Sequence, residues 1–178
     1  MDPALELTSV PPWATTPTRP GADLSGRFWS IVAFGTAGAD VAEFWCGQIA
    51  AVADESAVRV HEFGADDSAS DALAADVVDA RVGWRLMMAG PAYACLRLRA
   101  AALALGVADD EITVASTEVR TRSVQCAHCR AVTCRPTQLE DVVACAGCGR
   151  NLFVYYHVSR RQGAHLGFMV DAEQQAAS

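Results

Sequence analysis

Four cysteines near the C-terminal end form two Cys-x-x-Cys pairs. They lie in CAHCRAVTCRPTQLEDVVACAGC, which runs from Cys126 to Cys148 and carries five of the seven cysteines of the chain. In the spacing Cys126-x2-Cys129-x15-Cys145-x2-Cys148, each pair supplies two thiolates from one tight turn, and the intervening residues return the chain to close a tetrahedral site. This predicts one structural Zn²⁺. A rubredoxin-like iron or an iron–sulfur centre is the alternative.

A closed four-cysteine site leaves no coordination position for a substrate. We therefore expect zinc to fold this module and not to take part in catalysis. Gly147 and Gly149 suit the tight backbone of the second pair. Cys134, between the pairs, and His128, inside the first, are candidates for a spare ligand; for Cys134 the favoured interpretation is a small, buried or partly buried side chain.

The two remaining cysteines and the composition describe an ordinary globular protein. Cys46 and Cys95 fall within predicted helices, where core positions are expected. A length of 178 residues with 52% hydrophobic content allows one domain plus a small module. Residues 1–119 carry 17 acidic residues against 7 arginines, net −10, whereas residues 120–178 carry 4 against 7, net +3. This change of charge places the predicted domain boundary near Arg120.

The sequence favours a cytoplasmic protein without a membrane partner. No apolar run approaches the length of a membrane span, and MDPALELTSVPPW has neither the basic start nor the apolar centre of a secretory signal. In a reducing compartment, paired Cys-x-x-Cys motifs bind metal or are redox-active more often than they form disulfides.

Strands and helices alternate after an irregular, proline-rich arm at residues 1–25. The predicted strands are Phe28–Phe34, Ala57–Phe63, Trp84–Gly90 and Ile112–Ser116, and the predicted helices are Asp40–Ala53, Ser70–Val82 and Ala92–Leu105. This order implies parallel pairing through right-handed crossovers. Residues 26–120 are therefore predicted to form a small α/β domain of three layers around a parallel sheet.

Residues 121–173 are predicted to form a β-rich four-cysteine zinc ribbon, followed by a tail at 174–178. Leu152–Val158 and His165–Val170 have the pattern of strands, and Arg160 to Gly163 that of a turn. Tyr155 and Tyr156 occupy adjacent strand positions and should face opposite sides.

A glycine-rich turn follows the first predicted strand. AFGTAGAD (Ala33–Asp40) leads into a helix N-terminus, where backbone N–H groups can bind a phosphate. The turn departs from GxGxxG, and Asp40 either occupies the place of an anion or caps the helix.

A longer stretch, Met88–Val119, resembles the last third of the pyridine-nucleotide module in ferredoxin reductase-type flavoproteins. Gly90, Pro91, Tyr93, Gly106, Val107 and Glu118 carry this resemblance, with Gly35-Thr36 as the first phosphate-binding turn. It implies a nucleotide cleft formed by Gly35, Thr36, Gly38, Gly90, Pro91 and Glu118. The cysteine that often precedes the Gly-Pro pair is Ala89 here, and no flavin-binding barrel precedes the domain.

Two readings of this cleft stay open: a bound NAD(P)H, or a retained fold whose cleft is empty or filled by a partner. HEFGADDSASD after the second strand contains no arginine to pair with a 2′-phosphate, so NAD is favoured over NADP.

The tail VYYHVSRRQGAHLGFMVDAE, taken with the cysteine pairs, resembles the C-terminal domain of the small subunit of heme-dependent dimethylamine monooxygenase, also described as an oxidative N-demethylase complex. The resemblance rests on Tyr156-His157, Ser159-Arg160-Arg161, Gly163, Gly167-Phe168 and Asp171-Ala172-Glu173. Both resemblances together cover residues 27 to 173. They imply a complex in which a flavin and iron–sulfur reductase chain and a heme subunit use reduced nicotinamide and O₂ to convert a secondary methylamine to a primary amine and formaldehyde.

The chain has no evident heme ligands, flavin domain or paired acid and base, so we expect assembly or docking of the reductase and heme subunits, not catalysis. Arg160, Arg161 and His165 form a compact cationic group able to hold a carboxylate or phosphate, and these residues with His157 are the predicted docking residues.

Two other functions are weighed against this one. A nucleic-acid-binding or regulatory ribbon is disfavoured because a net charge of +3 is small and the first domain is acidic. A standalone NAD(P)H-dependent electron-transfer protein needs a redox-active metal in the cysteine site and, ordinarily, a flavin.

Overall fold

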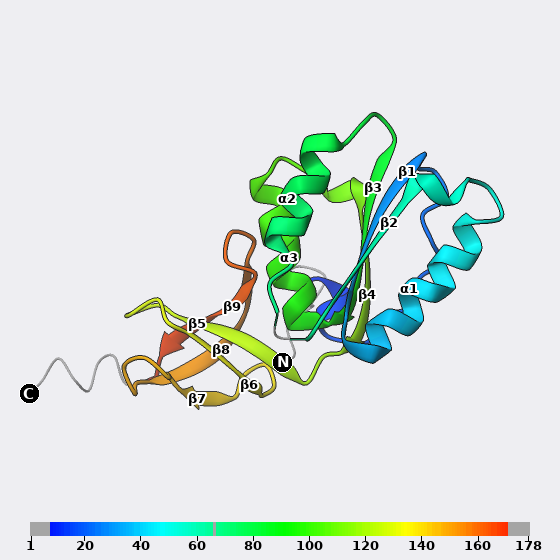
Figure 1. Ribbon diagram of the computed structural model, residues 1–178. Helices are drawn as coiled ribbons and strands as arrows, with labels where there is room; N and C mark the ends of the chain where they lie inside the picture. The colour runs from blue at the N-terminus through cyan, green and yellow to red at the C-terminus, as the bar shows by residue number, and fades with distance from the viewer. Residues whose placement is uncertain (1–7, 66, 171–178) are drawn as a thin grey trace, which may run out of the picture.

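Two β-sheets follow one another along the chain (Figure 1) in the computed structural model, which describes residues 8–65 and 67–170. The first sheet has four parallel strands in the order β2-β1-β3-β4. Its strands are β1 (Phe28–Phe34), β2 (Val58–Phe63), β3 (Trp84–Pro91) and β4 (Ile112–Glu118). The four predicted strands and their parallel pairing are confirmed, with ends that differ by one or two residues.

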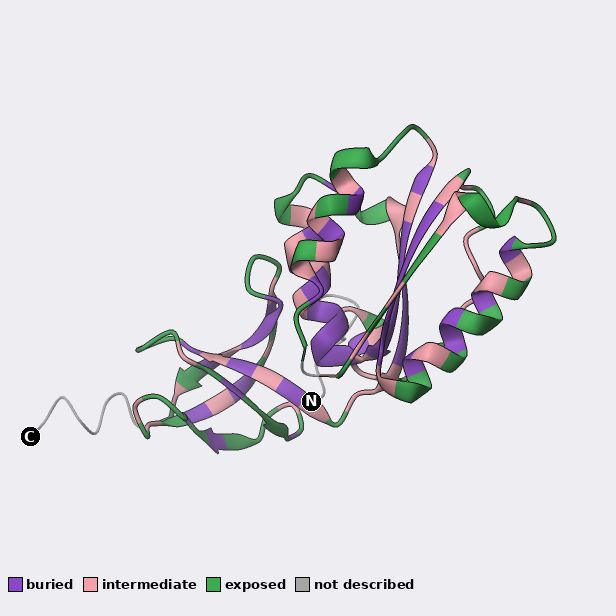
Figure 2. Cartoon of the chain, viewed as in Figure 1, coloured by how far each residue is buried: buried purple, intermediate pink, exposed green. Residues whose placement is uncertain are grey.

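Helices cover both faces of this sheet. In Figure 1, α1 (Gly35–Ile49) lies on one face, and α2 (Ser70–Asp79) and α3 (Ala92–Ala104) lie on the other. Trp45 and Ile49 fill the layer beneath α1, while Leu73 and Leu98 fill the layer beneath α2 and α3. Figure 2 shows the buried residues gathered along the strands between these layers. The predicted three-layer α/β domain is therefore confirmed.

The first helix begins earlier than its composition predicts. It starts at Gly35, directly after β1, and ends at Ile49, whereas Asp40–Ala53 was expected. A Cβ atom on Gly38 would lie 2.6 Å from the carbonyl oxygen of Ala89, so the glycine allows the helix to approach β3 closely. The second helix ends at Asp79 instead of Val82, and Val78 near its end is 85% exposed. Single turns of 3-10 helix precede β2 and β4, at η3 (Glu55–Ala57) and η4 (Asp109–Glu111).

The second sheet has five strands in the order β6-β5-β9-β8-β7 and forms, with its loops, what we call the four-cysteine module, residues 121–170. Its strands are β5 (Thr121–Cys126), β6 (Val132–Pro136), β7 (Val142–Ala144), β8 (Asn151–Ser159) and β9 (Ala164–Met169). The predicted strands β8 and β9 and their turn are confirmed. The first three strands are short, and the sequence analysis assigned none of them.

The N-terminal arm is more ordered than predicted. Residues Pro12–Ala14 form a 3-10 helix, η2. Val10 and Ala14 share one buried cluster with Leu96 of α3 and Val158 of β8. Thr18 donates its backbone N–H to the Ser116 carbonyl at the outer edge of β4. The arm therefore packs against the α/β domain and the four-cysteine module together.

The turn between β8 and β9 also joins the two parts. Gly163 is buried with φ +61°, and a Cβ atom there would lie 2.4 Å from the Leu96 carbonyl oxygen of α3. Only glycine fits both this conformation and this distance. Among the described residues, no helix has the length and apolar character needed to cross a membrane.

Candidate metal centre and partner-binding surface

Two matching turns bring four cysteines together. Cys126 is the last residue of β5 and Cys129 lies in the turn that follows, while Cys145 and Cys148 lie in the turn after β7. The sulfur atoms all lie within 4.8 Å of one another, with Sγ–Sγ distances of 3.8 Å for Cys126 and Cys148 and 3.5 Å for Cys129 and Cys145. The cysteine cluster predicted from the spacing is confirmed.

The two turns repeat one backbone pattern. Arg130 N–H donates to the Cys126 carbonyl and Gly149 N–H to the Cys145 carbonyl, each at 2.9 Å. The donor residue has a left-handed conformation in both turns, with φ 65° at Arg130 and 71° at Gly149. Glycine adopts this conformation without cost, whereas arginine does not. The role predicted for Gly149 is therefore confirmed, and the first turn reaches the same geometry under strain.

Close packing and backbone N–H donors stabilise the conformation of the second turn, which carries Cys145 and Cys148. A Cβ atom on Gly147 would lie 2.6 Å from the Ala131 side chain and 3.2 Å from Cys129 Sγ, which explains the second predicted glycine. Backbone N–H groups of Cys148 and Gly147 donate toward Cys145 Sγ and, against the effect of burial, lower the pKa of this thiol to about 6. The thiolate is the form that binds metal.

This cluster fits a tetrahedral metal ion. Four thiolates about 2.3 Å from a central Zn²⁺ have sulfur atoms about 3.7 Å apart, close to the spacing seen here. Four thiolates complete the coordination, so the site can bind and hold an ion but offers no position for a substrate.

The other cysteines and His128 lie outside the cluster. Cys134 is exposed on β6, so its expected burial is wrong, and it does not belong to the group of four. Cys95 is buried in α3, where burial raises the pKa of its thiol to about 12. Cys46 is half-buried and packs against the core beneath α1.

The four predicted docking residues do not form one exposed group. His165 is 1% exposed within β9, and burial, with Arg122 nearby, lowers the pKa of its ring to about 4. It is therefore neutral and inaccessible, and the predicted cationic group is wrong at this position. Arg160, Arg161 and His157 are exposed, and Arg160 Nη2 lies 3.8 Å from Asp109 Oδ2 of the α/β domain.

A further exposed surface, formed by β8 and β9, was not predicted from the sequence. Between Val154 and Val158, β8 contains three residues where β9 has one, so the register shifts by two residues. The Tyr155 ring stacks on His157 at 5.4 Å and meets Phe168 of β9 edge-on at 5.5 Å, and Phe153 lies 6.3 Å away. We call these four residues the aromatic face. Tyr155 is 40% and Phe168 46% exposed.

The bulge also alters the relation of the two tyrosines. Their rings lie 6.2 Å apart in an edge-on arrangement, so simple alternation across the strand does not describe them. A two-residue period cannot predict a bulge, which is why the aromatic face was not foreseen.

The residues of the predicted nucleotide cleft meet at the carboxyl edge of the first sheet. Pro91 pairs with Glu118, and a Cβ atom on Gly90 (φ +153°) would lie 2.6 Å from Phe34 Cβ, next to Gly35. Gly38 is buried beneath Ala89, and Thr36 is exposed. Glu118 already accepts hydrogen bonds from the backbone N–H groups of Arg120 and Thr121. The packing accounts for Gly38 and Gly90 without a ligand, and nucleotide binding stays a prediction.

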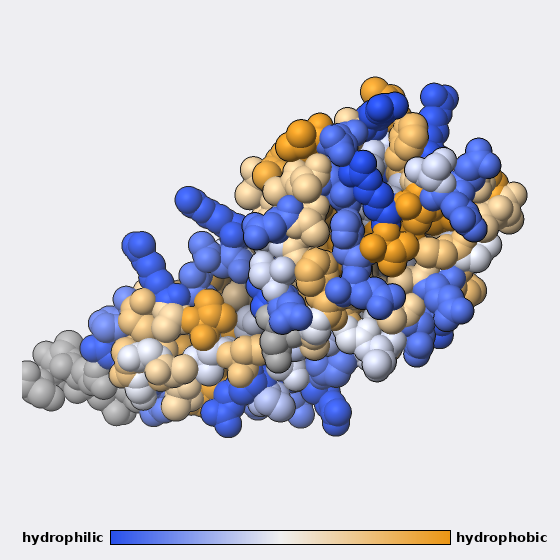
Figure 3. Space-filling model, in the orientation of Figure 1, coloured by the Kyte–Doolittle hydropathy of each residue, from blue (hydrophilic) through white to orange (hydrophobic). Residues whose placement is uncertain are grey.

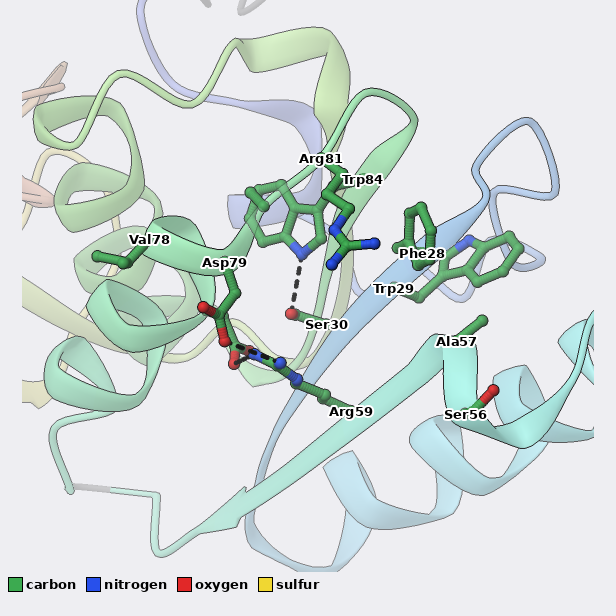
Figure 4. Close-up of a pocket in the computed structure, with 12 residues that line it drawn as sticks. Phe28, Trp29, Ser30, Ser56, Ala57, Arg59, Val78, Asp79, Arg81 and Trp84 are labelled. Atoms are coloured by element: carbon green, nitrogen blue, oxygen red, sulfur yellow. Dashed lines mark hydrogen bonds and ion pairs between the residues drawn. The ribbon is translucent and has the colours of Figure 1, made fainter.

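A cavity of about 620 Å³ lies at the opposite, amino edge of the sheet (Figure 4). The Trp84 indole N–H donates to Ser30 Oγ at 3.0 Å, and Arg59 bonds Asp76 and Asp79 at 3.0 and 2.9 Å. Asp76 is 4% exposed and also contacts His61 Nε2 at 2.8 Å. These polar groups satisfy one another, so the network fastens α2 to the sheet.

Comparisons with known proteins find one family that matches part of the four-cysteine module and one similar protein. Residues 123–168 match the family described as dimethylamine monooxygenase subunit DmmA-like, C-terminal domain. The chain is also 41% identical over 102 residues to the heme-dependent oxidative N-demethylase delta subunit of Ectopseudomonas mendocina (strain ymp). That alignment covers 57% of this chain and 57% of the relative, so the chain spans little more than half the length of the relative it matches. No solved structure matches the chain. The resemblance to the small subunit of dimethylamine monooxygenase is thus confirmed, with residues 123–168 matching its DmmA-like C-terminal domain.

Proposed function

We propose that this chain is an accessory subunit of a heme-dependent oxidative N-demethylase complex of the dimethylamine monooxygenase kind. The observation that carries the proposal is the match of residues 123–168 to the DmmA-like C-terminal domain, on a structure whose cysteine site is closed. A closed site binds structural metal and does no chemistry on a substrate. The subunit therefore acts in assembly or docking, and the heme, flavin and iron–sulfur groups belong to partner chains.

The metal in this proposal is Zn²⁺. Four thiolates in a tetrahedron suit zinc or iron, and a zinc site is colourless whereas an iron site absorbs visible light. Metal analysis and an absorption spectrum of the purified chain distinguish the two. One equivalent of zinc without colour is expected, and it would also exclude the standalone electron-transfer alternative. Stoichiometric iron with a visible spectrum would contradict the structural assignment.

The aromatic face, together with the exposed Arg161 of the β8–β9 turn, is the proposed docking surface. Exposed aromatic side chains are the typical anchors of protein interfaces. Residues 121–170 carry six arginines and two acidic residues, so the surface suits an acidic region on the reductase or heme subunit. Figure 3 shows the exposed hydrophobic residues of the visible face in separate groups between hydrophilic ones.

Co-purification tests this proposal. The chain is co-expressed with the reductase and heme subunits, and omitting it is expected to lower N-demethylation. The double variant Tyr155→Ser, Phe168→Ser should reduce recovery of the partner chains about tenfold or more, as loss of two interface anchors does. Val132→Ser is the matched control, because Val132 is 48% exposed on β6, away from the aromatic face.

If the partner chains do not co-purify with the wild-type chain and demethylation proceeds equally without it, the proposal fails. Salt-sensitive binding to random DNA or RNA at micromolar protein would instead favour the nucleic-acid alternative.

A further inference from the structure

A second cavity, of about 640 Å³, lies where the arm, the link between the sheets and the β6–β7 connection meet. Its polar lining includes Thr15, Arg120, Arg122, Thr137 and Asp141. The volume falls within the range of about 300–1,000 Å³ that is usual for ligand sites. Unlike the network at Ser30 and Asp76, this lining contains a buried charge without a counter-ion.

Arg122 is that charge. It is 9% exposed, and among the described residues it takes part in no ion pair within 4 Å. Its Nη1 donates to the carbonyl oxygens of Val119 and Ala14, at 2.7 and 3.3 Å. Its Nε is buried without a hydrogen-bond partner. Because Nη1 is held and Nε is buried, Nη2 is the part of the guanidinium left to bind another group.

The nearby carboxylates do not fill this role. Glu118 accepts from the backbone N–H groups of Arg120 and Thr121, and Asp141 accepts from Thr137 Oγ1 and Gln138 N–H. Burial lowers the pKa of Arg122, and Glu118 and Asp141 offset this only in part. Arginine nevertheless stays protonated, so its charge remains uncompensated in the interior.

The lining indicates the kind of anion that fits. Among the residues that line the cavity, Arg120 and Arg122 exceed Asp141 by one charge, and Glu118 lies next to the lining, so the site can balance at most one negative charge. The Nη2 group carries two N–H donors and part of the guanidinium charge, and a carboxylate is a strong acceptor for such charge-assisted hydrogen bonds. Val119, Pro136 and Leu139 supply apolar walls for a short aliphatic chain.

We propose that this cavity binds a monoanionic aliphatic carboxylate, with Arg122 as its anchor. The carboxylate comes either from a free short-chain acid or from an Asp or Glu side chain of a partner subunit. The first source is independent of the function proposed above, and only the second rests on it.

The test follows the Arg122 side-chain Nε–H signal in the ¹⁵N-labelled chain during titration with sodium butyrate. Butyramide, which has the same shape without the charge, and sodium chloride at equal ionic strength are the matched probes. Butyrate should shift the signal and saturate in the millimolar range, whereas neither control should. For the second source, the same signal is followed as the reductase and heme subunits are added without butyrate; a shift that butyrate then reverses identifies a partner carboxylate.

Two variants keep the test independent of folding. Arg122→Gln should abolish the butyrate response, and Arg120→Gln, at a side chain that is 89% exposed, should weaken binding at least threefold without affecting folding. Arg135→Gln is the control, because Arg135 is exposed and pairs with Arg122 across β5 and β6 but does not line the cavity.

The proposal is overturned if neither butyrate nor the partner subunits shift the Arg122 signal, or if butyramide shifts it equally. It is also overturned if His165→Gln moves the Arg122 Nε–H signal while butyrate does not. His165 Nδ1 is the second buried atom without a partner, and that result would mean the two residues satisfy each other.

Discussion

The two parts of the chain are held together by different forces. The α/β domain has apolar layers on both faces of its sheet, with two tryptophans, Trp29 and Trp45, fully buried. Among the described residues, the four-cysteine module has one buried cluster of six residues, and two of them, Cys126 and Cys145, belong to the group of cysteines that could bind a metal ion. A core this small does not stabilise fifty residues alone. We therefore expect the structure of the module, and of any surface it presents to a partner, to depend on the proposed metal.

Loss of the metal should unfold one part and spare the other. Structural zinc contributes on the order of 10 kcal/mol to such modules, so chelation or Cys145→Ser should unfold residues 121–170. Trp29, Trp45 and Trp84 lie in the α/β domain, whereas Trp13 also packs against the cluster that includes Val158, so tryptophan fluorescence of a Trp13→Phe variant reports on the α/β domain. It should stay native while backbone NMR signals of the module collapse.

Cys134→Ser is the control for this change, because Cys134 is exposed and outside the cluster. A module that keeps its dispersed NMR signals after complete metal removal would show that the comparison between the two parts is wrong.

The contact between the two parts can be broken at one glycine. Gly163→Val places side-chain atoms against the Leu96 backbone and forces φ +61° on a β-branched residue, at a cost of about 3 kcal/mol. Thermal unfolding should change from one transition to two. Gly47→Ala in α1 is the control, since a Cβ atom there contacts nothing within 4 Å and should stabilise the helix by up to about 1 kcal/mol. A single transition in the Gly163 variant would show that the arm alone couples the two parts.

The α/β domain should be sensitive to its buried carboxylate. Although burial raises it, hydrogen bonds from Ser30, His61 and Arg59 together lower the pKa of Asp76 below 3.8. Asp76→Asn should therefore destabilise this domain by about 2 kcal/mol near pH 7, measured by urea unfolding with tryptophan fluorescence.

The pH dependence of that effect follows from the lowered pKa. A carboxyl group whose pKa is lower in the folded state stabilises that state above about pH 4, and this stabilisation is lost as the pH falls through the folded-state pKa. The free energies of unfolding of the wild type and the variant should therefore become equal in acid. A difference that persists unchanged at pH 3 would show that shape, and not charge, is responsible.

The smallest predicted change in stability comes from substituting the residue with left-handed conformation in each of the two cysteine turns. Arg130→Gly removes the left-handed strain and should stabilise the module by about 1 kcal/mol, whereas Gly149→Ala introduces the same strain and should destabilise it by a similar amount. Competition with a zinc chelator measures both. Equal chelator resistance in the two variants would contradict the matched geometry of the turns.

The elements with strong local signals could be predicted from the sequence. The parallel sheet followed from apolar runs separated by helix-length segments, and the metal cluster followed from cysteine spacing, because ligand geometry fixes which residues must meet. The start of α1 was missed because Gly35 and Gly38 have low helix propensity, which close packing against Ala89 overrides.

Features that depend on distant residues could not be predicted. The bulge that creates the aromatic face arises from the pairing of β8 with β9. The strands β6 and β7 are too short to show a pattern, and β5 alternates in burial but has Arg122 at one of its buried positions, so no apolar pattern reveals it. The burial of His165 and of Arg122 depends on packing between strands far apart in the sequence. From their charge and hydrogen-bonding capacity alone, both residues would be expected on the surface.

The most direct test of the account compares the metal-loaded and metal-free chain in assembly with the reductase and heme subunits. Size-exclusion chromatography of the reconstituted mixture measures whether the chain elutes with the partner subunits. Tryptophan fluorescence checks that the α/β domain is intact. The zinc-loaded chain should elute with the partner subunits, and the metal-free chain should elute alone with native fluorescence. Equal assembly of both forms would contradict the claim that the four-cysteine module holds the docking surface in place.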